Sequence, residues 1–185
     1  MYSYSQIERL AYETLLNFNL LQAPIDLYDL ANKLSISIES QFLDNDISGF
    51  LLKKDEKTII GLNKNHPKVR QRFTIAHEIG HFKLHNSDSP LFIDYFYKGS
   101  ILRPKNVDKI YRRNKNGNNP LMEKQANFFA ANLLMPKKLI EKEILELSEN
   151  LDYDDKLKRL SEKFKVSEIA MDYRLKALGH YDYGF

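Results

Sequence analysis

The chain has 185 residues, of which 43% are apolar and 29% charged, values typical of a soluble globular protein of one domain. It contains no cysteine, which excludes disulfide bonds, thiolate metal sites and a cysteine nucleophile, and its net charge of +3 is too small to indicate a nucleic-acid or membrane partner by itself. Because the first residues lack a signal pattern and no apolar run approaches the roughly 20 residues of a membrane span, we expect a cytoplasmic protein.

The first half of the chain is predicted to contain two helices followed by about three strands. The helices are indicated by apolar residues at helical spacing and by Pro24, which suits the first position of a short helix. The strands are indicated by alternating apolar residues and by two apolar segments around a polar stretch, the pattern of a β-hairpin. The predicted helices span residues 5–17 and 24–34, and the predicted strands lie around residues 36–38, 49–52 and 58–62.

The second half is predicted to be helical apart from one long loop. Pro67 suits the first position of a helix that runs to about His85. Residues 86–119 lack clear periodicity, which predicts a loop with a basic insert at 103–118. We expect one α+β domain over residues 1–185, with a helix-turn-helix-like subregion at 154–180. The further predicted helices span residues 121–135, 137–149, 154–164 and 167–178.

Residues 77–81 read His-Glu-Ile-Gly-His within the first of these helices. Because side chains four residues apart lie on one face of a helix, His77 and His81 can direct both imidazoles at one point. Zn²⁺ binds imidazole nitrogen in tetrahedral sites, and Mn²⁺ or another divalent ion is a further possibility. Glu78 follows the first histidine and is placed to act as a general base on a water molecule at the metal. The alternative is an ordinary helix with two partly exposed histidines.

A catalytic zinc site needs a third protein ligand, and His85 is the nearest candidate in the sequence. At 1.5 Å per residue, His85 lies about 12 Å along the helix axis from His77. Three imidazoles spread over that length of a straight helix cannot share one ion. We therefore expect His85 to pack against the helix end or to cap it.

Glu123 is the better candidate for the third ligand. It shares a helical stripe with Ala126 and Ala130, small residues that, together with Gly80, would let two helices approach closely. Asn127 lies one turn after Glu123 and is expected to orient a metal ligand. The helix dipole also favours an acidic residue in the first turn of any helix, so the stripe alone leaves the role of Glu123 open.

The segments Ala76–His85 and Glu123–Pro136 together resemble the ImmA/IrrE family of metallo-endopeptidases. A weaker resemblance covers the predicted hairpin from Ser48 to Asn63, and the similarity as a whole extends over roughly residues 25–180. The resemblance implies a zincin-like α+β fold. In such a fold, a small antiparallel sheet of about three strands packs on the helix with the two histidines, and the C-terminal end is helical.

The resemblance also implies a gluzincin-like site in which His77, His81 and Glu123 bind the metal and Glu78 is catalytic. Members of the family typically cleave helix-turn-helix repressors of mobile elements or stress regulons. We therefore expect a zinc-dependent endopeptidase whose partner is a transcriptional repressor or another regulatory protein. The basic insert 103–118 departs from the family pattern and leaves the substrate open.

Two other functions fit parts of the sequence. Residues 160–178 read as helix, turn and helix, with Ser167 as a good N-cap, which is compatible with a DNA-binding regulator. The second of these helices offers only Arg174 and Lys176 as cations, so we expect no direct nucleic-acid binding. The other alternative is an inactive relative, an antirepressor that binds its partner through the C-terminal helices without cutting it.

Overall fold

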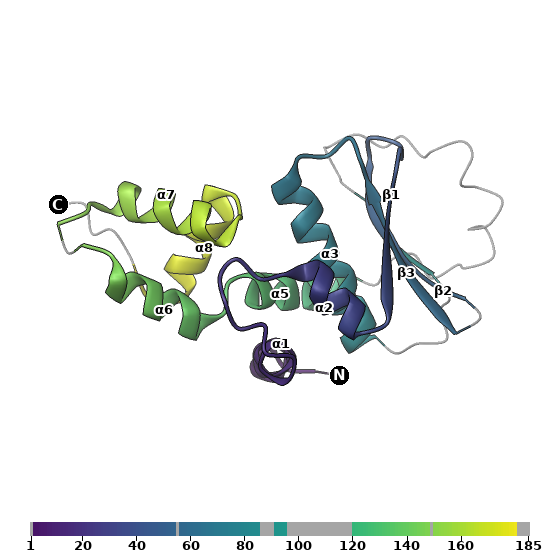
Figure 1. Ribbon diagram of the computed structural model, residues 1–185, viewed down its shortest axis with the longest axis horizontal. Helices are drawn as coiled ribbons and strands as arrows, with labels where there is room; N and C mark the ends of the chain where they lie inside the picture. The colour runs from purple at the N-terminus through teal and green to yellow at the C-terminus, as the bar shows by residue number, and fades with distance from the viewer. Residues whose placement is uncertain (1, 55, 86–90, 96–119, 149, 181–185) are drawn as a thin grey trace.

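The computed structural model describes residues 2–54, 56–85, 91–95, 120–148 and 150–180. These residues form a mixed sheet and a set of helices that lie on one side of it (Figure 1). The α+β class expected from the sequence is confirmed. The helices are α1 (Tyr4–Asn17), α2 (Leu27–Lys33), α3 (Lys68–Leu84), α5 (Pro120–Leu134), α6 (Lys137–Glu146), α7 (Tyr153–Phe164) and α8 (Glu168–Ala177). The strands are β1 (Ile36–Gln41), β2 (Ile47–Lys54), β3 (Lys57–Asn63) and β4 (Leu91–Tyr95).

The helix starts follow the capping chemistry of the sequence. Ser3 caps α1 in a capping box with Gln6, and each side chain bonds to the backbone N–H of the other residue. The prediction that Pro24 opens the second helix is wrong by three residues. The Asp26 carboxylate accepts the backbone N–H groups of Tyr28 and Asp29, so α2 begins at Leu27.

The sheet has the strand order β1-β3-β2-β4. β2 and β3 pair antiparallel, as expected for the predicted hairpin, and β4 pairs antiparallel with the other edge of β2. β1 pairs parallel with β3, so the expectation of an entirely antiparallel sheet is wrong for this strand. The buried Asn63 amide holds the connection between β1 and β2 by donating to the carbonyls of Leu43, Asp44 and Ile47.

β4 lies in a segment that the sequence predicted to be loop. A five-residue strand is too short for its alternation to stand out, and its partner strand β2 is about 40 residues away in the chain. The basic insert 103–118 lies outside the described residues.

Helix α3 packs on the apolar face of β2 and β3. On this face Leu51 and Ile60 are paired across the ladder and fully buried. Gly49 lies close to both neighbours of β2, because a Cβ atom there would be 2.5 Å from the Gly61 carbonyl oxygen on β3 and 2.5 Å from the Thr74 methyl group on α3. β2 therefore approaches α3 more closely than a side chain would permit.

Replacing Gly49 by alanine is expected to destabilise the fold, because the added methyl group meets a backbone carbonyl that cannot rotate away. Overpacking of this kind lowers the free energy of unfolding by about 1–3 kcal/mol. Urea denaturation measures the change, and Lys57→Ala, at the exposed start of β3, serves as the control. Unchanged stability of Gly49→Ala would show that the space between β2 and α3 can accommodate a methyl group.

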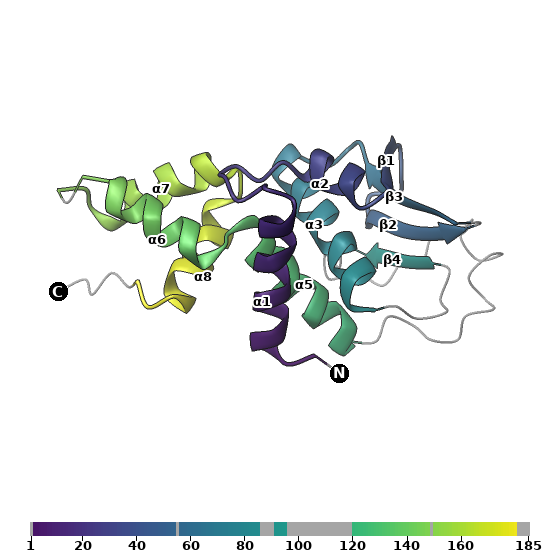
Figure 2. The same ribbon diagram turned by 60° about the horizontal axis from the view of Figure 1, so that its bottom comes forward.

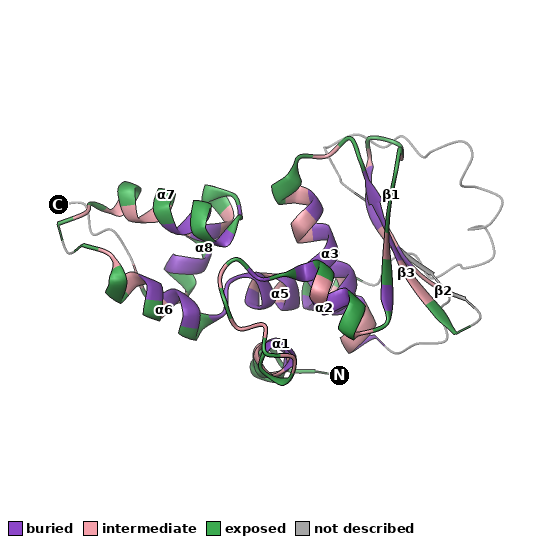
Figure 3. Ribbon diagram, in the orientation of Figure 1, coloured by how far each residue is buried: buried purple, intermediate pink, exposed green. Residues whose placement is uncertain are grey.

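Helix α5 is the centre of the molecule, and the views in Figures 1 and 2 show it between α3 on one side and α1 on the other. The surfaces along which α3 and α5 meet are buried (Figure 3). Beyond α5 the chain turns into α6, α7 and α8, which lie away from the sheet (Figure 1). The single-domain assignment and the helix-turn-helix-like subregion 154–180 stay predictions.

Arg174 links α8 to other parts of the protein through polar contacts. Its side chain is buried, donates a 3.0 Å hydrogen bond from Nε to the Met135 carbonyl, and lies 3.6 Å from the Glu8 carboxylate on α1. Burial lowers the pKa of this guanidinium, and the nearby Glu8 charge offsets part of that effect. Within the described ranges, no helix combines the length and the apolar character that crossing a membrane requires.

Candidate metal centre

Helix α3 carries His77, Glu78 and His81 into the interior between the sheet and α5. His77 is 1% exposed, His81 is 2% exposed and Glu78 is fully buried. The alternative of two partly exposed histidines is therefore wrong. Imidazoles and a carboxylate that are withdrawn from water need polar partners or a metal ion to offset the loss of hydration.

Glu123, in the first turn of α5, faces the two histidines. Its two carboxylate oxygens lie 3.3 Å from the Nε2 atoms of His77 and His81, and these two nitrogens are 3.0 Å apart. Atoms bound to a tetrahedral zinc ion at about 2.0–2.1 Å are roughly 3.3–3.4 Å from one another. The spacing, together with two imidazole nitrogens and one carboxylate as donors, fits a divalent metal ion.

Close packing of α3 and α5 creates this convergence. A Cβ atom on Gly80 would lie 3.1 Å from the carbonyl oxygen of Ala126 and 3.2 Å from its Cα atom. Gly80, Ala126 and Ala130 are all buried where the two helices meet. The small residues noted in the sequence therefore allow a ligand on one helix to reach ligands on the other.

Asn127 lies one turn after Glu123 and contacts the far side of the His77 ring. The distance from Asn127 Oδ1 to His77 Nδ1 is 2.8 Å, which is the length of a good hydrogen bond. When Nδ1 donates its proton to this amide oxygen, Nε2 of the same neutral ring presents a lone pair to the cluster. The placement fits the expected role of Asn127 in orienting a ligand.

The protonation states of Glu123 and His81 suit metal binding. Burial raises the pKa of Glu123, but its hydrogen-bond contacts with His77 and His81 lower the pKa more, from 4.5 to about 2. Burial lowers the pKa of His81, and contact with Glu123 offsets part of that shift. An ionised carboxylate and neutral rings are the protonation states that bind a metal, which takes the place of ring protons.

Among the described residues, His77, His81 and Glu123 form the group able to hold a metal ion, and His85 is outside it. His85 instead caps the C-terminal end of α3, as expected, and is buried. Sequence reasoning missed its contacts with His81 and with Gln125 on α5. The four-residue spacing of His81 and His85 places both rings on one helix face, whereas the sequence gives no indication of the contact with Gln125.

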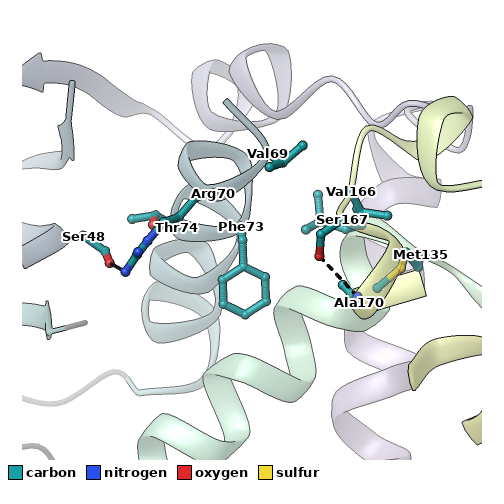
Figure 4. Close-up of a pocket in the computed structure, with 10 residues that line it drawn as sticks. Ser48, Val69, Arg70, Phe73, Thr74, Met135, Val166, Ser167 and Ala170 are labelled. Atoms are coloured by element: carbon teal, nitrogen blue, oxygen red, sulfur yellow. Dashed lines mark hydrogen bonds between the residues drawn. The ribbon is translucent and has the colours of Figure 1, made fainter. Parts of the chain in front are cut away.

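An apolar cavity of about 350 Å³ lies between α3 and the turn from α7 to α8 (Figure 4). Phe73 points into it from α3, and Val166 and Ala170 close the opposite side. The Phe73 ring is also 6.3 Å from the imidazole of His77, one turn later on the same helix. Phe73 is therefore the lining residue that relates the cavity to the candidate metal centre, whose own three residues do not line it.

Residues that would stabilise a developing oxyanion are not identified by the described part of the chain. Tyrosine hydroxyl groups can donate to an oxyanion, but Tyr97 and Tyr111 lie outside the described residues, and for Tyr95 in β4 only the backbone is described. His180 follows α8 and is not part of the metal-binding group found among the described residues.

The fold and the cluster define a zincin-like protein with a candidate metal centre made of two histidines and a glutamate. Residues 31–176, more than three quarters of the chain, match the family model described as IrrE N-terminal-like domain, Peptidase M78, and the chain belongs to this family. Membership supports a metallopeptidase-type function and confirms the resemblance to the ImmA/IrrE family. Among curated proteins, none matches the chain.

Proposed function

We propose that the protein is a zinc-dependent endopeptidase in which His77, His81 and Glu123 hold the metal and Glu78 is the general base. The observation that carries the proposal is the convergence of three ligand atoms, from two helices, with the 3.0–3.3 Å spacings of a metal site. Membership of a peptidase family supports the same chemistry.

A metal ion in this position would polarise the scissile carbonyl group and lower the pKa of a water molecule to about 7. The Glu78 carboxylate takes a proton from the attacking water and delivers it to the leaving amine. His77 and His81 stay neutral ligands throughout, and the ionised Glu123 balances part of the positive charge. Burial of Glu78 supports this role, because solvent does not compete for its carboxylate.

The cavity lined by Phe73, Val166 and Ala170 supports a polypeptide substrate. Its walls are mostly apolar, and one of them, the Phe73 ring, has its centroid 6.3 Å from that of the metal-ligand candidate His77. An extended chain bound across the metal would place one of its side chains next to this space. We propose that the cavity receives an apolar side chain close to the scissile bond.

We further propose that the substrate is a transcriptional repressor or a similar regulatory protein in the cytoplasm. This part of the proposal rests on the family resemblance, in which repressors are the typical substrates. An exchange of Zn²⁺ for Mn²⁺ or another divalent ion would preserve the mechanism, because imidazole and carboxylate ligands suit several such ions.

Incubation of the zinc-loaded protein with a repressor encoded beside its gene tests the proposal. We expect discrete fragments of the repressor, no fragments in the presence of a chelator, and recovery when Zn²⁺ is restored. Mass spectrometry of the fragments identifies the cleaved bond and the side chain next to it. Tight binding of the intact repressor without cleavage would favour the inactive, antirepressor alternative instead.

The DNA-binding alternative finds little support in α8. Arg174 is buried and held by the contacts described above, and Lys176 pairs with Asp172 at 2.7 Å. The large hydrophobic side chains exposed on this helix are Ile169 and Tyr173, one turn apart. A recognition helix needs cations and polar groups on its exposed face. We therefore retain a role for α8 in packing or in protein contacts.

A further inference from the structure

A chain of hydrogen bonds extends from the N-terminal segment to the ring of His81. Gln125, buried on α5, donates from Nε2 to the backbone carbonyl of Tyr2 over 2.9 Å. Its amide oxygen lies 3.2 Å from Nε2 of His85, and Nδ1 of His85 lies 3.0 Å from Nδ1 of His81. Gln125 and both histidines are buried, so the two contacts that join Gln125 to His85 and His85 to His81 are made away from solvent.

The direction of every bond follows from the carbonyl at one end. A carbonyl oxygen only accepts, so the Gln125 amide must turn its NH₂ group towards Tyr2 and its oxygen towards His85. The facing Nε2 of His85 therefore donates, and Nδ1 of the same neutral ring accepts. The proton between the two rings then belongs to Nδ1 of His81, and Nε2 of His81 is left with its lone pair towards Glu123 and His77.

We propose that His85 and Gln125 are positioning residues that hold the metal ligand His81 in the tautomer and orientation in which Nε2 faces the ion. The inference rests on the proposed metal centre. It differs from that proposal because neither residue touches the metal or the substrate. An acceptor on the far nitrogen of a ligating imidazole fixes the ring and raises its basicity.

The two ligands of α3 are thus oriented from the same neighbouring helix by different means. Asn127 contacts the His77 ring directly, whereas Gln125, two residues earlier on α5, reaches His81 through His85. The extra link is needed because His81 is one turn further along α3 than His77. His85 lies one turn after His81 on α3 and contacts both His81 and Gln125.

The test compares His85→Leu, which removes the acceptor, with His85→Asn, whose amide oxygen can take the place of Nδ1. We expect His85→Leu to weaken Zn²⁺ binding by about 10- to 100-fold, the range typical of such outer partners, and His85→Asn to restore most of the affinity. Zn²⁺ dissociation constants are measured by competition with a chromophoric chelator. Thermal unfolding of each metal-free variant identifies any that fails to fold.

A second readout is independent of affinity. In the zinc-loaded protein the Nδ1 proton of His81 is expected to give a slowly exchanging, downfield proton resonance, which His85→Leu abolishes and His85→Asn retains. Gln125→Met is expected to weaken Zn²⁺ binding less than His85→Leu. The double variant should be no weaker than His85→Leu alone, because both residues act through one chain of bonds.

Failure of the positioning role can be distinguished from failure of the proposed metal centre. If the parent protein binds Zn²⁺ and His85→Leu binds it equally tightly with the resonance unchanged, the positioning role is wrong and the metal centre stands. If His85→Asn is as weak as His85→Leu in a folded protein, the acceptor is not what matters, and the role is equally wrong. If the parent protein binds no Zn²⁺, both this inference and the proposed function fail.

Discussion

Glu78→Gln is expected to reduce cleavage of the repressor substrate by about 10²- to 10⁴-fold, the contribution typical of a general base. The amide has the shape of the carboxylate but cannot accept a proton from the attacking water. Because Glu78 is not among the residues whose ligand atoms converge, the variant should bind one Zn²⁺ as the parent does. Single-turnover cleavage measured beside metal stoichiometry separates the two effects.

A control is provided by Glu56→Gln, which makes the same chemical change at an exposed position in the turn between β2 and β3. It should cleave at the parent rate. Full activity of Glu78→Gln would remove this residue from the role of base. Loss of zinc together with activity would instead show that Glu78 supports the site structurally, so the two readouts must be made on the same preparation.

Glu123→Ala is expected to abolish stoichiometric Zn²⁺ binding at micromolar metal and, with it, cleavage. The change removes the only carboxylate of the cluster and leaves two imidazoles from a single helix. The loss of affinity should exceed the roughly 10- to 100-fold expected for residues that only orient ligands. Equilibrium dialysis followed by elemental analysis measures the bound metal directly.

Glu162→Ala, on the exposed side of α7, is the matched control and should bind one Zn²⁺. Because Glu123 is partly exposed, with 23% of its side chain accessible, its removal should leave the fold intact. Zinc binding by Glu123→Ala with parent affinity would mean that another group supplies the third ligand. The gluzincin-like assignment would then be wrong.

Much of the centre could be predicted because its geometry is local. Two histidines four residues apart must share a helix face, and an intervening glycine indicates a close neighbour. What the spacing could not decide was the role of Glu123, since a first-turn acidic residue is common in any helix. Only the folded structure distinguishes a metal ligand from a residue that merely favours the helix dipole, because it places the Glu123 oxygens 3.3 Å from the Nε2 atoms of both rings.

Features that depend on distant pairing were not predictable in the same way. β1 pairs with β3 and not with β2, the next strand in the chain, and β4 joins β2 across about 40 residues of chain. The role inferred for His85 depends on an amide of another helix, Gln125, whose orientation is fixed by a backbone carbonyl near the N-terminus. Sequence periodicity carries no information about such contacts.

Anomalous diffraction at the zinc edge from crystals of the metal-loaded protein tests the central claim most directly. We predict one peak, about 2.0–2.1 Å from Nε2 of His77, Nε2 of His81 and a carboxylate oxygen of Glu123, with the fourth position open to solvent or substrate. A peak elsewhere, or a fourth protein ligand that closes the site, would contradict the account.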